Sequence, residues 1–132
     1  MNRDKERGAA AVEFAILLPV LLLLLLGIME FGRAYNAQIA LTNAAREGAR
    51  VMAISNVRLD AEKTAQEAAS TLAISETNPA FDFDFTDRGG ATYTSCASQR
   101  QVTLTISYDL DTLTGIAGPF TLTGKGTMLC GG

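Results

Sequence analysis

The sequence predicts an α+β fold: a long N-terminal helix, a second short helix, and then a small antiparallel sheet of three or four strands. Three observations carry this prediction. Residues 9–29 hold a single charge, Glu13, in an otherwise apolar segment. Residues 30–55 repeat apolar side chains every three to four positions, and from residue 81 apolar and polar side chains alternate. With 132 residues, the chain has room for one small domain.

The apolar segment 9–29 is long enough to cross a membrane. At about 1.5 Å per residue, such a helix covers roughly 30 Å, the thickness of a hydrocarbon core. A soluble helix this apolar would need partners on every face, and a 14.0 kDa chain has too few large apolar residues to provide them. We therefore expect a transmembrane helix. No small-x-small cleavage site follows in Glu30-Phe31-Gly32-Arg33, which argues against an ordinary signal peptide.

The helix is expected to continue beyond the membrane as a helical stalk over residues 30–55, because this stretch contains no proline. Its spacing predicts one mostly apolar stripe, formed by Phe31, Tyr35, Gln38, Leu41, Ala45, Gly48 and Met52. Arg46, Glu47 and Arg50 track another face, which is either solvated or in contact with a partner's stalk. Three basic residues precede the span, against Arg33 and Arg46 soon after it. This bias favours a cytoplasmic N-terminus.

Residues 56–132 are expected to form an exported α+β head. Its helix is predicted over residues 60–73, with Asp60 as N-cap and an inner face of Ala61, Ala65, Ala68 and Leu72. Asn78-Pro79 is expected to end this helix.

Alternation predicts the strands of the head. Phe81, Phe83 and Phe85 alternate with polar residues, and Gly89-Gly90 marks a turn. A second strand is predicted around Val102, Leu104, Ile106 and Tyr108, and another begins at Phe120 and Leu122. We expect these strands to cover the stalk helix.

Composition argues against several functions. The chain has no His, which removes Ser-His-Asp and Cys-His catalysis and the commonest zinc ligand. No nucleophile–base pair or phosphate-binding loop is recognisable, so we expect no enzyme, no catalytic residues and no cofactor. A formal net charge of −3 does not favour nucleic acid as a partner.

One acidic pattern resembles part of a calcium loop. Asp82-x-Asp84-x-x-Asp87 is followed by Gly89-Gly90, but it lacks the third alternate ligand and the following glycine of an EF-hand. Strand alternation explains Asp82 and Asp84 without a metal, so we predict no metal site.

The two cysteines, Cys96 and Cys130, both lie in the C-terminal third. In an exported head an oxidised pair would be natural. The sequence alone leaves two alternatives open, a Cys96–Cys130 disulfide and two buried, reduced thiols.

The N-terminal letters "RGAAAVEF", residues 7–14, resemble the processing motif of type IV-class prepilins. In that motif a basic leader ends in glycine, and the fifth residue after the cut is glutamate. An aromatic residue follows in the variant of the tight-adherence (Tad, or Flp) system. The corresponding residues here are Gly8, the first mature residue Ala9, Glu13 and Phe14.

The following letters, "LLPVLLLLLLGIMEFGRAYNAQIALTNAAREGAR" (17–50), resemble the TadE-like family, which comprises minor pseudopilins of that system. Pro19, the EFGR block and the AAREGAR block occur in the family's order. TadF proteins have a similar opening, so a TadF-like relative is an alternative.

The resemblance implies a pilin-like fold and a minor pseudopilin role in assembling Tad/Flp adhesive pili. It implies a leader, residues 1–8, removed by a prepilin peptidase of the bacterial inner membrane. Glu13 would pair with the terminal amine of a neighbouring subunit; the alternative is that it only reaches the lipid headgroups. Pro19 would be structural. Implied partners are the membrane, the peptidase, other pilin and pseudopilin subunits, and the inner-membrane platform. A signal-anchored exported module that binds a ligand or calcium is the competing interpretation.

Overall fold

The structure, a computed structural model, describes residues 3–72, 80–115 and 118–131, with side chains from residue 8 onward. The chain divides into two compact units, Met1–Arg33 and Ala34–Gly132. The second unit is called the head below. Each unit is described by itself.

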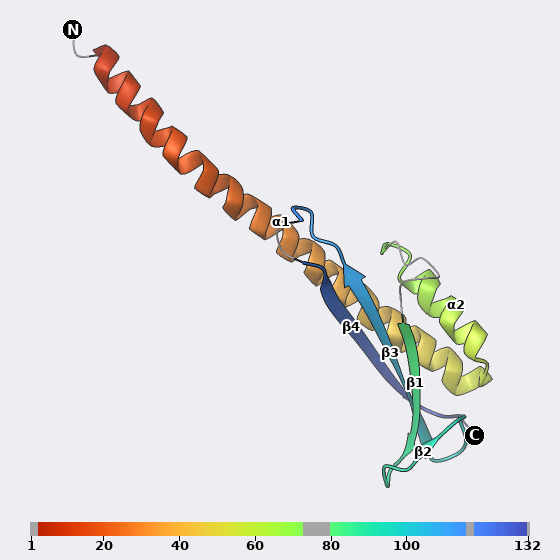
Figure 1. Ribbon diagram of the computed structural model, residues 1–132. Helices are drawn as coiled ribbons and strands as arrows, with labels where there is room; N and C mark the ends of the chain where they lie inside the picture. The colour runs from red at the N-terminus through yellow and green to blue at the C-terminus, as the bar shows by residue number, and fades with distance from the viewer. Residues whose placement is uncertain (1–2, 73–79, 116–117, 132) are drawn as a thin grey trace. The chain divides into compact units, whose positions relative to one another are not determined.

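Helix α1 runs without interruption from Arg3 to Ser55 (Figure 1). It contains the predicted apolar segment and the predicted stalk, and Pro19 lies inside it. Proline removes one backbone hydrogen bond, which membrane helices tolerate. The expectation of one long N-terminal helix is confirmed.

Helix α2, Arg58–Ala68, begins two residues earlier than predicted. Asn56 takes a left-handed backbone conformation (φ 54°) and reverses the chain after α1. Val57 is therefore the N-cap, and the Ser55 hydroxyl accepts a hydrogen bond from the Val57 N–H at 3.1 Å. The prediction of Asp60 as N-cap was wrong, because Asp60 already lies in the first helical turn.

The inner face of α2 also differs by one residue from the prediction. Ala61, Ala65 and Ala69 are buried, whereas Ala68 is exposed. Residues four apart lie on one helix face, and Ala69 continues that row just beyond the helix end. Leu72 packs against the same core, as predicted. Asn78-Pro79 lies outside the described residues.

The sheet of the head has four strands in the order β2-β1-β3-β4, and all neighbours are antiparallel. Its strands are β1 (Ala80–Asp87), β2 (Thr92–Tyr93), β3 (Arg100–Leu110) and β4 (Phe120–Leu129). The three longer strands match the predicted alternation, and the α+β fold class is confirmed. The short strand β2 was not predicted, because two residues carry no periodicity.

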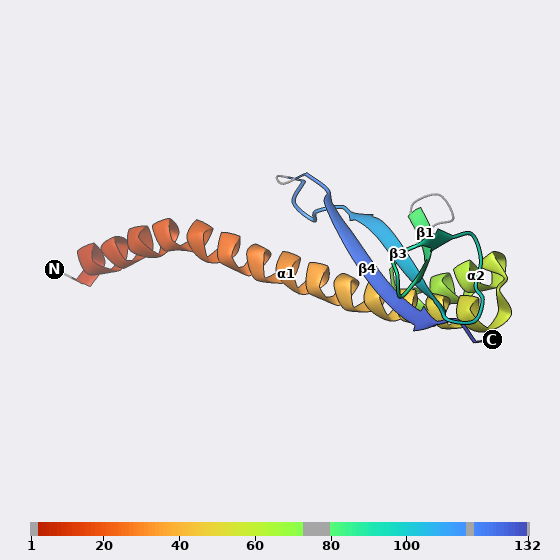
Figure 2. The same cartoon turned by 90° about the horizontal axis from the view of Figure 1, so that it is seen from below.

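The core lies between the sheet and the helices of the head, and Figure 2 shows both helices on one side of the sheet. Leu41, Leu104 and Ile106 are fully buried at its centre. Around Leu41, alanines of α1 let the strands approach closely. The expectation that the strands cover this part of the helix is confirmed.

The predicted apolar stripe of α1 is buried only in its second part. Leu41, Ala45, Gly48 and Met52 are buried. Phe31 and Tyr35 are 82% and 68% exposed, because the buried stripe begins at Ala37. On the other predicted face of the stalk, the side chains of Arg46, Glu47 and Arg50 are exposed. The Arg50 guanidinium and the Glu47 carboxylate lie 3.9 Å apart.

Candidate processing and assembly segment

The N-terminal unit presents an apolar helix surface to its surroundings. Every side chain from residue 8 to residue 29 is exposed within the chain. The described residues contain one helix long and apolar enough to cross a membrane, within Gly8–Ser55, with a mean hydropathy of 2.7 over its most apolar window. Water is a poor environment for such a continuous apolar surface, which fits a membrane anchor.

Gly8 lies in helical backbone near the start of α1. A Cβ added there would meet nothing within 4 Å, so no packing requires glycine at this position. A protease needs an extended substrate, and glycine costs a helix about 1 kcal/mol relative to alanine. Gly8 is exposed and lowers the intrinsic stability of this end of the helix.

Glu13 follows Ala9 by four residues, so both lie on the same face of α1 one turn apart. Among the described side chains, none forms a hydrogen bond or ion pair with Glu13. A carboxylate in a membrane helix costs about 2.5–3.5 kcal/mol at the bilayer centre. Phe14, 62% exposed, lies next to it. Glu13 is exposed within the chain.

In the head, Cys96 and Cys130 are joined by a disulfide with a Cα–Cα distance of 5.4 Å. It connects the segment between β2 and β3 to the residue after β4. Two hydrogen bonds hold these segments to the last turn of α1 and to the residue after it. The Cys96 N–H donates to the Asn56 side-chain oxygen at 3.0 Å, and the Gly131 N–H donates to the Ala53 carbonyl at 3.1 Å.

The three aspartates of the calcium-like pattern do not converge. Asp82 and Asp84 are exposed on β1, whereas Asp87 caps the following turn. Its carboxylate accepts hydrogen bonds from the N–H groups of Gly89 and Ala91 at 2.8 and 3.0 Å. Within the described ranges, no group of three His, Cys, Asp or Glu residues could hold a metal ion. The calcium-binding interpretation therefore gains no support.

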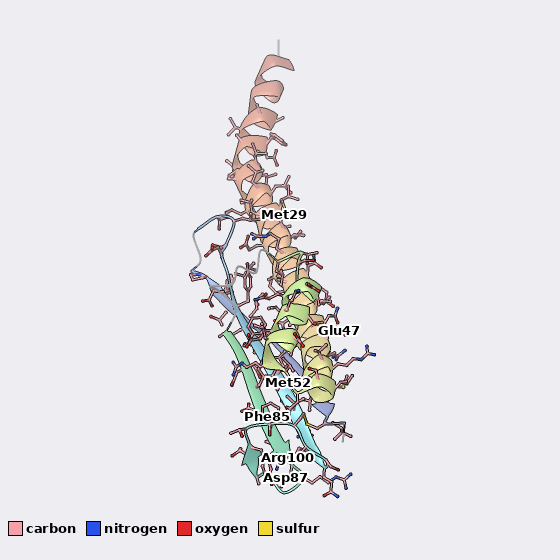
Figure 3. All side chains as sticks on the ribbon, turned by 90° about the vertical axis from the view of Figure 1, so that its right-hand side faces the viewer. Met29, Glu47, Met52, Phe85, Asp87 and Arg100 are labelled. Carbon is pink, nitrogen blue, oxygen red and sulfur yellow. A yellow bond between two sulfur atoms is a disulfide. The ribbon has the colours of Figure 1, made fainter. Side chains whose placement is uncertain are left out.

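The Tyr93 hydroxyl also donates to Asp87, at 2.8 Å, and this bond is the largest cause of a lowered Asp87 pKa. The same bond raises the pKa of Tyr93. In the strand register, Asp87 of β1 lies opposite Arg100 of β3 at one end of the sheet (Figure 3). The Arg100 guanidinium stacks on the Tyr93 ring, 3.6 Å from the centre of the ring. The hollow beside them, about 650 Å³, has a mostly polar lining. These contacts stabilise the turn.

The stacking of Arg100 on Tyr93 was not predicted from the sequence, because this contact depends on the two-residue strand β2 and on the strand register. The positions of Asp82 and Asp84 on the polar side of a strand were predicted from alternation alone. The structure describes Gly8, Ala9, Glu13, Phe14 and Pro19 on one helix and the two cysteines in the head.

The fold and the N-terminal segment together define a class of protein with one apolar helix that fits a membrane anchor and an α+β head. Within that class, residues 8–50 match the family model TadE, described as TadE-like protein. The resemblance predicted from the N-terminal motifs is thereby confirmed over this range, which includes Gly8, Glu13 and Pro19. The match implies a component related to the Tad pilus. Residues 51–132 lie outside it. Comparison with curated proteins gave no match, and comparison with solved structures gave none either.

Proposed function

We propose that this protein is a minor pseudopilin-like component in the assembly of Tad/Flp adhesive pili and is not an enzyme. The TadE-like match over residues 8–50 carries the proposal, since it covers the processing motif from Gly8, the apolar segment and residues 30–50 of the predicted stalk. Residues 9–29 hold the chain in the bacterial inner membrane, with the N-terminus in the cytoplasm and the head outside. Its partners are a prepilin peptidase, other pilin and pseudopilin subunits, and their inner-membrane platform.

Cleavage after Gly8 creates a new amine at Ala9. An α-amine has an unperturbed pKa of about 7.7–8.0, so most of it is charged at neutral pH. This amine and the Glu13 carboxylate then form a compact pair of opposite charges at the helix end. The helix N-terminus itself also favours the carboxylate.

Lateral packing of such helices gives each charge a partner on the neighbouring subunit. The amine of one subunit neutralises Glu13 of the next, which offsets the cost of a carboxylate in lipid. Because the amine and the Glu13 carboxylate meet at only one axial offset between neighbouring helices, Glu13 sets the register between subunits. The head then presents its surface to the growing assembly.

Intact mass measurement tests the processing step. Membrane-extracted protein should lack residues 1–8 when the prepilin peptidase is present and retain them when it is absent. Gly8→Ala should block this loss, because a Cβ obstructs close passage of the extended backbone through the peptidase. Gly27→Ala is the matched control, since Gly27 lies in the same helix with nothing within 4 Å of its added Cβ. Equal processing of Gly8→Ala and wild type would contradict the assignment.

The role of Glu13 is tested separately. Glu13→Ala should insert into the membrane normally but reduce surface piliation, because the charge that sets the register is gone. Glu67→Gln is the control, since Glu67 is an exposed acid on α2, away from the N-terminal segment. Normal piliation with Glu13→Ala would remove Glu13 from assembly.

A further inference from the structure

We propose that the outer face of the sheet is a contact surface for a second copy of this chain, related by a two-fold axis that runs parallel to β3 between the two copies. The outer face is the side of the sheet turned away from α1 and α2 (Figure 2). The inference rests on the head alone and does not depend on the pilus role.

The outer face is largely polar, with acids on β1 and a base on β4. Asp82 and Asp84 are exposed on β1, and Lys125 is exposed on β4. Strand β3 between them presents the hydroxyls of Thr103, Thr105 and Ser107, and the hydroxyls of Thr103 and Thr127 lie 3.0 Å apart. Near the end of β3, the exposed Asp109 carboxylate accepts a hydrogen bond from the Thr121 hydroxyl at 2.7 Å. Strand β2 pairs only with Phe85 and Thr86, so it does not extend the sheet next to Asp82.

The strand register aligns one acid with one base. Asp82 pairs with Thr105 on β3, and Thr105 pairs with Lys125 on β4, so the three residues form one row across the sheet. Neighbouring strands are about 4.8 Å apart, which places the two charges roughly 10 Å apart across the row. Among the described ion pairs, neither Asp82 nor Lys125 takes part in one.

A two-fold axis parallel to β3 makes this row self-complementary. The rotation exchanges the β1 and β4 sides and leaves the height along the strands unchanged. Asp82 of each copy therefore faces Lys125 of the other, and Thr105 faces its own counterpart. A two-fold axis perpendicular to the strands would instead place β1 against β1 and bring acids together. The row of Asp82 and Lys125 selects the first axis, because opposite charges fix register across a contact.

The same axis suits two membrane-anchored chains. Strand β4 runs in the direction of α1, since Gly124 lies against Leu41 and the Gly131 N–H bonds to the Ala53 carbonyl. An axis along the strands is thus also close to parallel with this part of α1. With this axis, Ala34, the first residue of the head, lies at the same end of the pair in both copies. The perpendicular axis would send the two chains in opposite directions.

Carbodiimide cross-linking of the purified full chain in proteoliposomes tests the pairing. This reagent joins a carboxylate to an amine in direct contact. With an equal mixture of unlabelled and ¹⁵N-labelled chains, we expect cross-linked peptides that join residue 82 of one isotope to residue 125 of the other. Cross-links confined to peptides of a single isotope would show an intrachain contact and overturn the proposal.

Charge reversal sharpens the test. Asp82→Lys and Lys125→Asp should each abolish the mixed-isotope cross-link between residues 82 and 125, because the facing side chains are then two amines or two carboxylates, which repel each other and which the reagent cannot join. Mixing the two variants should restore cross-linking between them. One variant then carries a lysine at both positions of the row and the other an aspartate at both, so each contact again joins opposite charges.

Lys63→Asp, an exposed change on α2, is the control and should leave the cross-linking yield unchanged. Failure of the mixture of Asp82→Lys and Lys125→Asp to restore cross-linking would overturn the two-fold arrangement. Because the assay contains no peptidase or pilus machinery, a negative result leaves the proposed function intact.

Discussion

Gly126 of β4 lies directly against the backbone of Ala45 in α1. A Cβ added at Gly126 would lie 2.5 Å from the Ala45 carbonyl oxygen, well inside the distance that real Cβ atoms keep. One turn earlier on α1, Gly124 meets the backbone of Leu41 in the same way. The two glycines therefore let strand and helix pack backbone to backbone, which no residue with a side chain permits.

Gly126→Ala should destabilise the head. Backbone atoms cannot yield as a flexible side chain would, so we expect a loss of about 1–3 kcal/mol, typical of an overpacked core. For a unit of this size, that corresponds to a fall in melting temperature of at least about 5 °C. Thermal melting of the full chain in detergent, followed by tyrosine fluorescence, measures it.

Gly118→Ala is the matched control for Gly126→Ala. Nothing lies within 4 Å of the added Cβ, and Gly118 is not among the glycines with positive φ. Its melting temperature should match that of the wild type. An equal fall in both variants would show that the close approach of Gly126 to Ala45 is not the cause.

Patterns that repeat along the chain were predictable from sequence. The alternation of Val102, Leu104 and Ile106 identified both the strand and its buried face, since all three are fully buried. Hydropathy alone identified the apolar segment. These features depend on residues close together in sequence, where periodicity reports which face is covered.

Features that depend on which elements meet were not predictable. The close approach of Gly126 requires knowing that β4 lies on α1, and the row through Asp82, Thr105 and Lys125 requires the register of three strands. The apolar stripe predicted from helical spacing includes Tyr35, which is exposed, because helical spacing does not show where the sheet begins to cover the helix. The capping role of Asp87 likewise required the turn geometry.

The Asp87–Tyr93 hydrogen bond predicts a pH dependence at both extremes. The Asp87 pKa is lower in the folded head than in the unfolded chain, so this carboxylate stabilises the head above the unfolded value and the contribution is lost as pH falls through the folded pKa. The Tyr93 pKa is raised, so its contribution is present below the unfolded value and is lost as pH rises through the folded pKa. Tyr93→Phe should move the Asp87 pKa back toward its usual value, as measured by NMR titration of the carboxyl carbon. An unchanged Asp87 titration in Tyr93→Phe would exclude the hydroxyl as its main cause.

Asn56 combines a backbone conformation with a hydrogen bond, and two substitutions separate these effects. Asn56→Gly keeps the left-handed backbone but loses the bond to the Cys96 N–H, so we expect a loss of about 1 kcal/mol. Asn56→Ala loses the bond and also strains the backbone, which adds roughly 1–2 kcal/mol. Melting temperatures should therefore fall in the order wild type, Asn56→Gly, Asn56→Ala. Equal stability of the two variants would show that the backbone conformation at Asn56 carries no cost.

The disulfide between Cys96 and Cys130 should supply a large part of the stability of the head. It closes a loop with a sequence separation of 34, for which the chain-entropy model gives roughly 3–4 kcal/mol. The double variant Cys96→Ser/Cys130→Ser should lower the free energy of unfolding by about that amount, since the end of β4 then loses its covalent link to the segment between β2 and β3. Chemical denaturation of the wild type with and without reductant, beside the double variant, makes the comparison. Reductant should destabilise the wild type to the level of the double variant and leave that variant unchanged, whereas a wild type insensitive to reductant would show that the bridge does not support the fold.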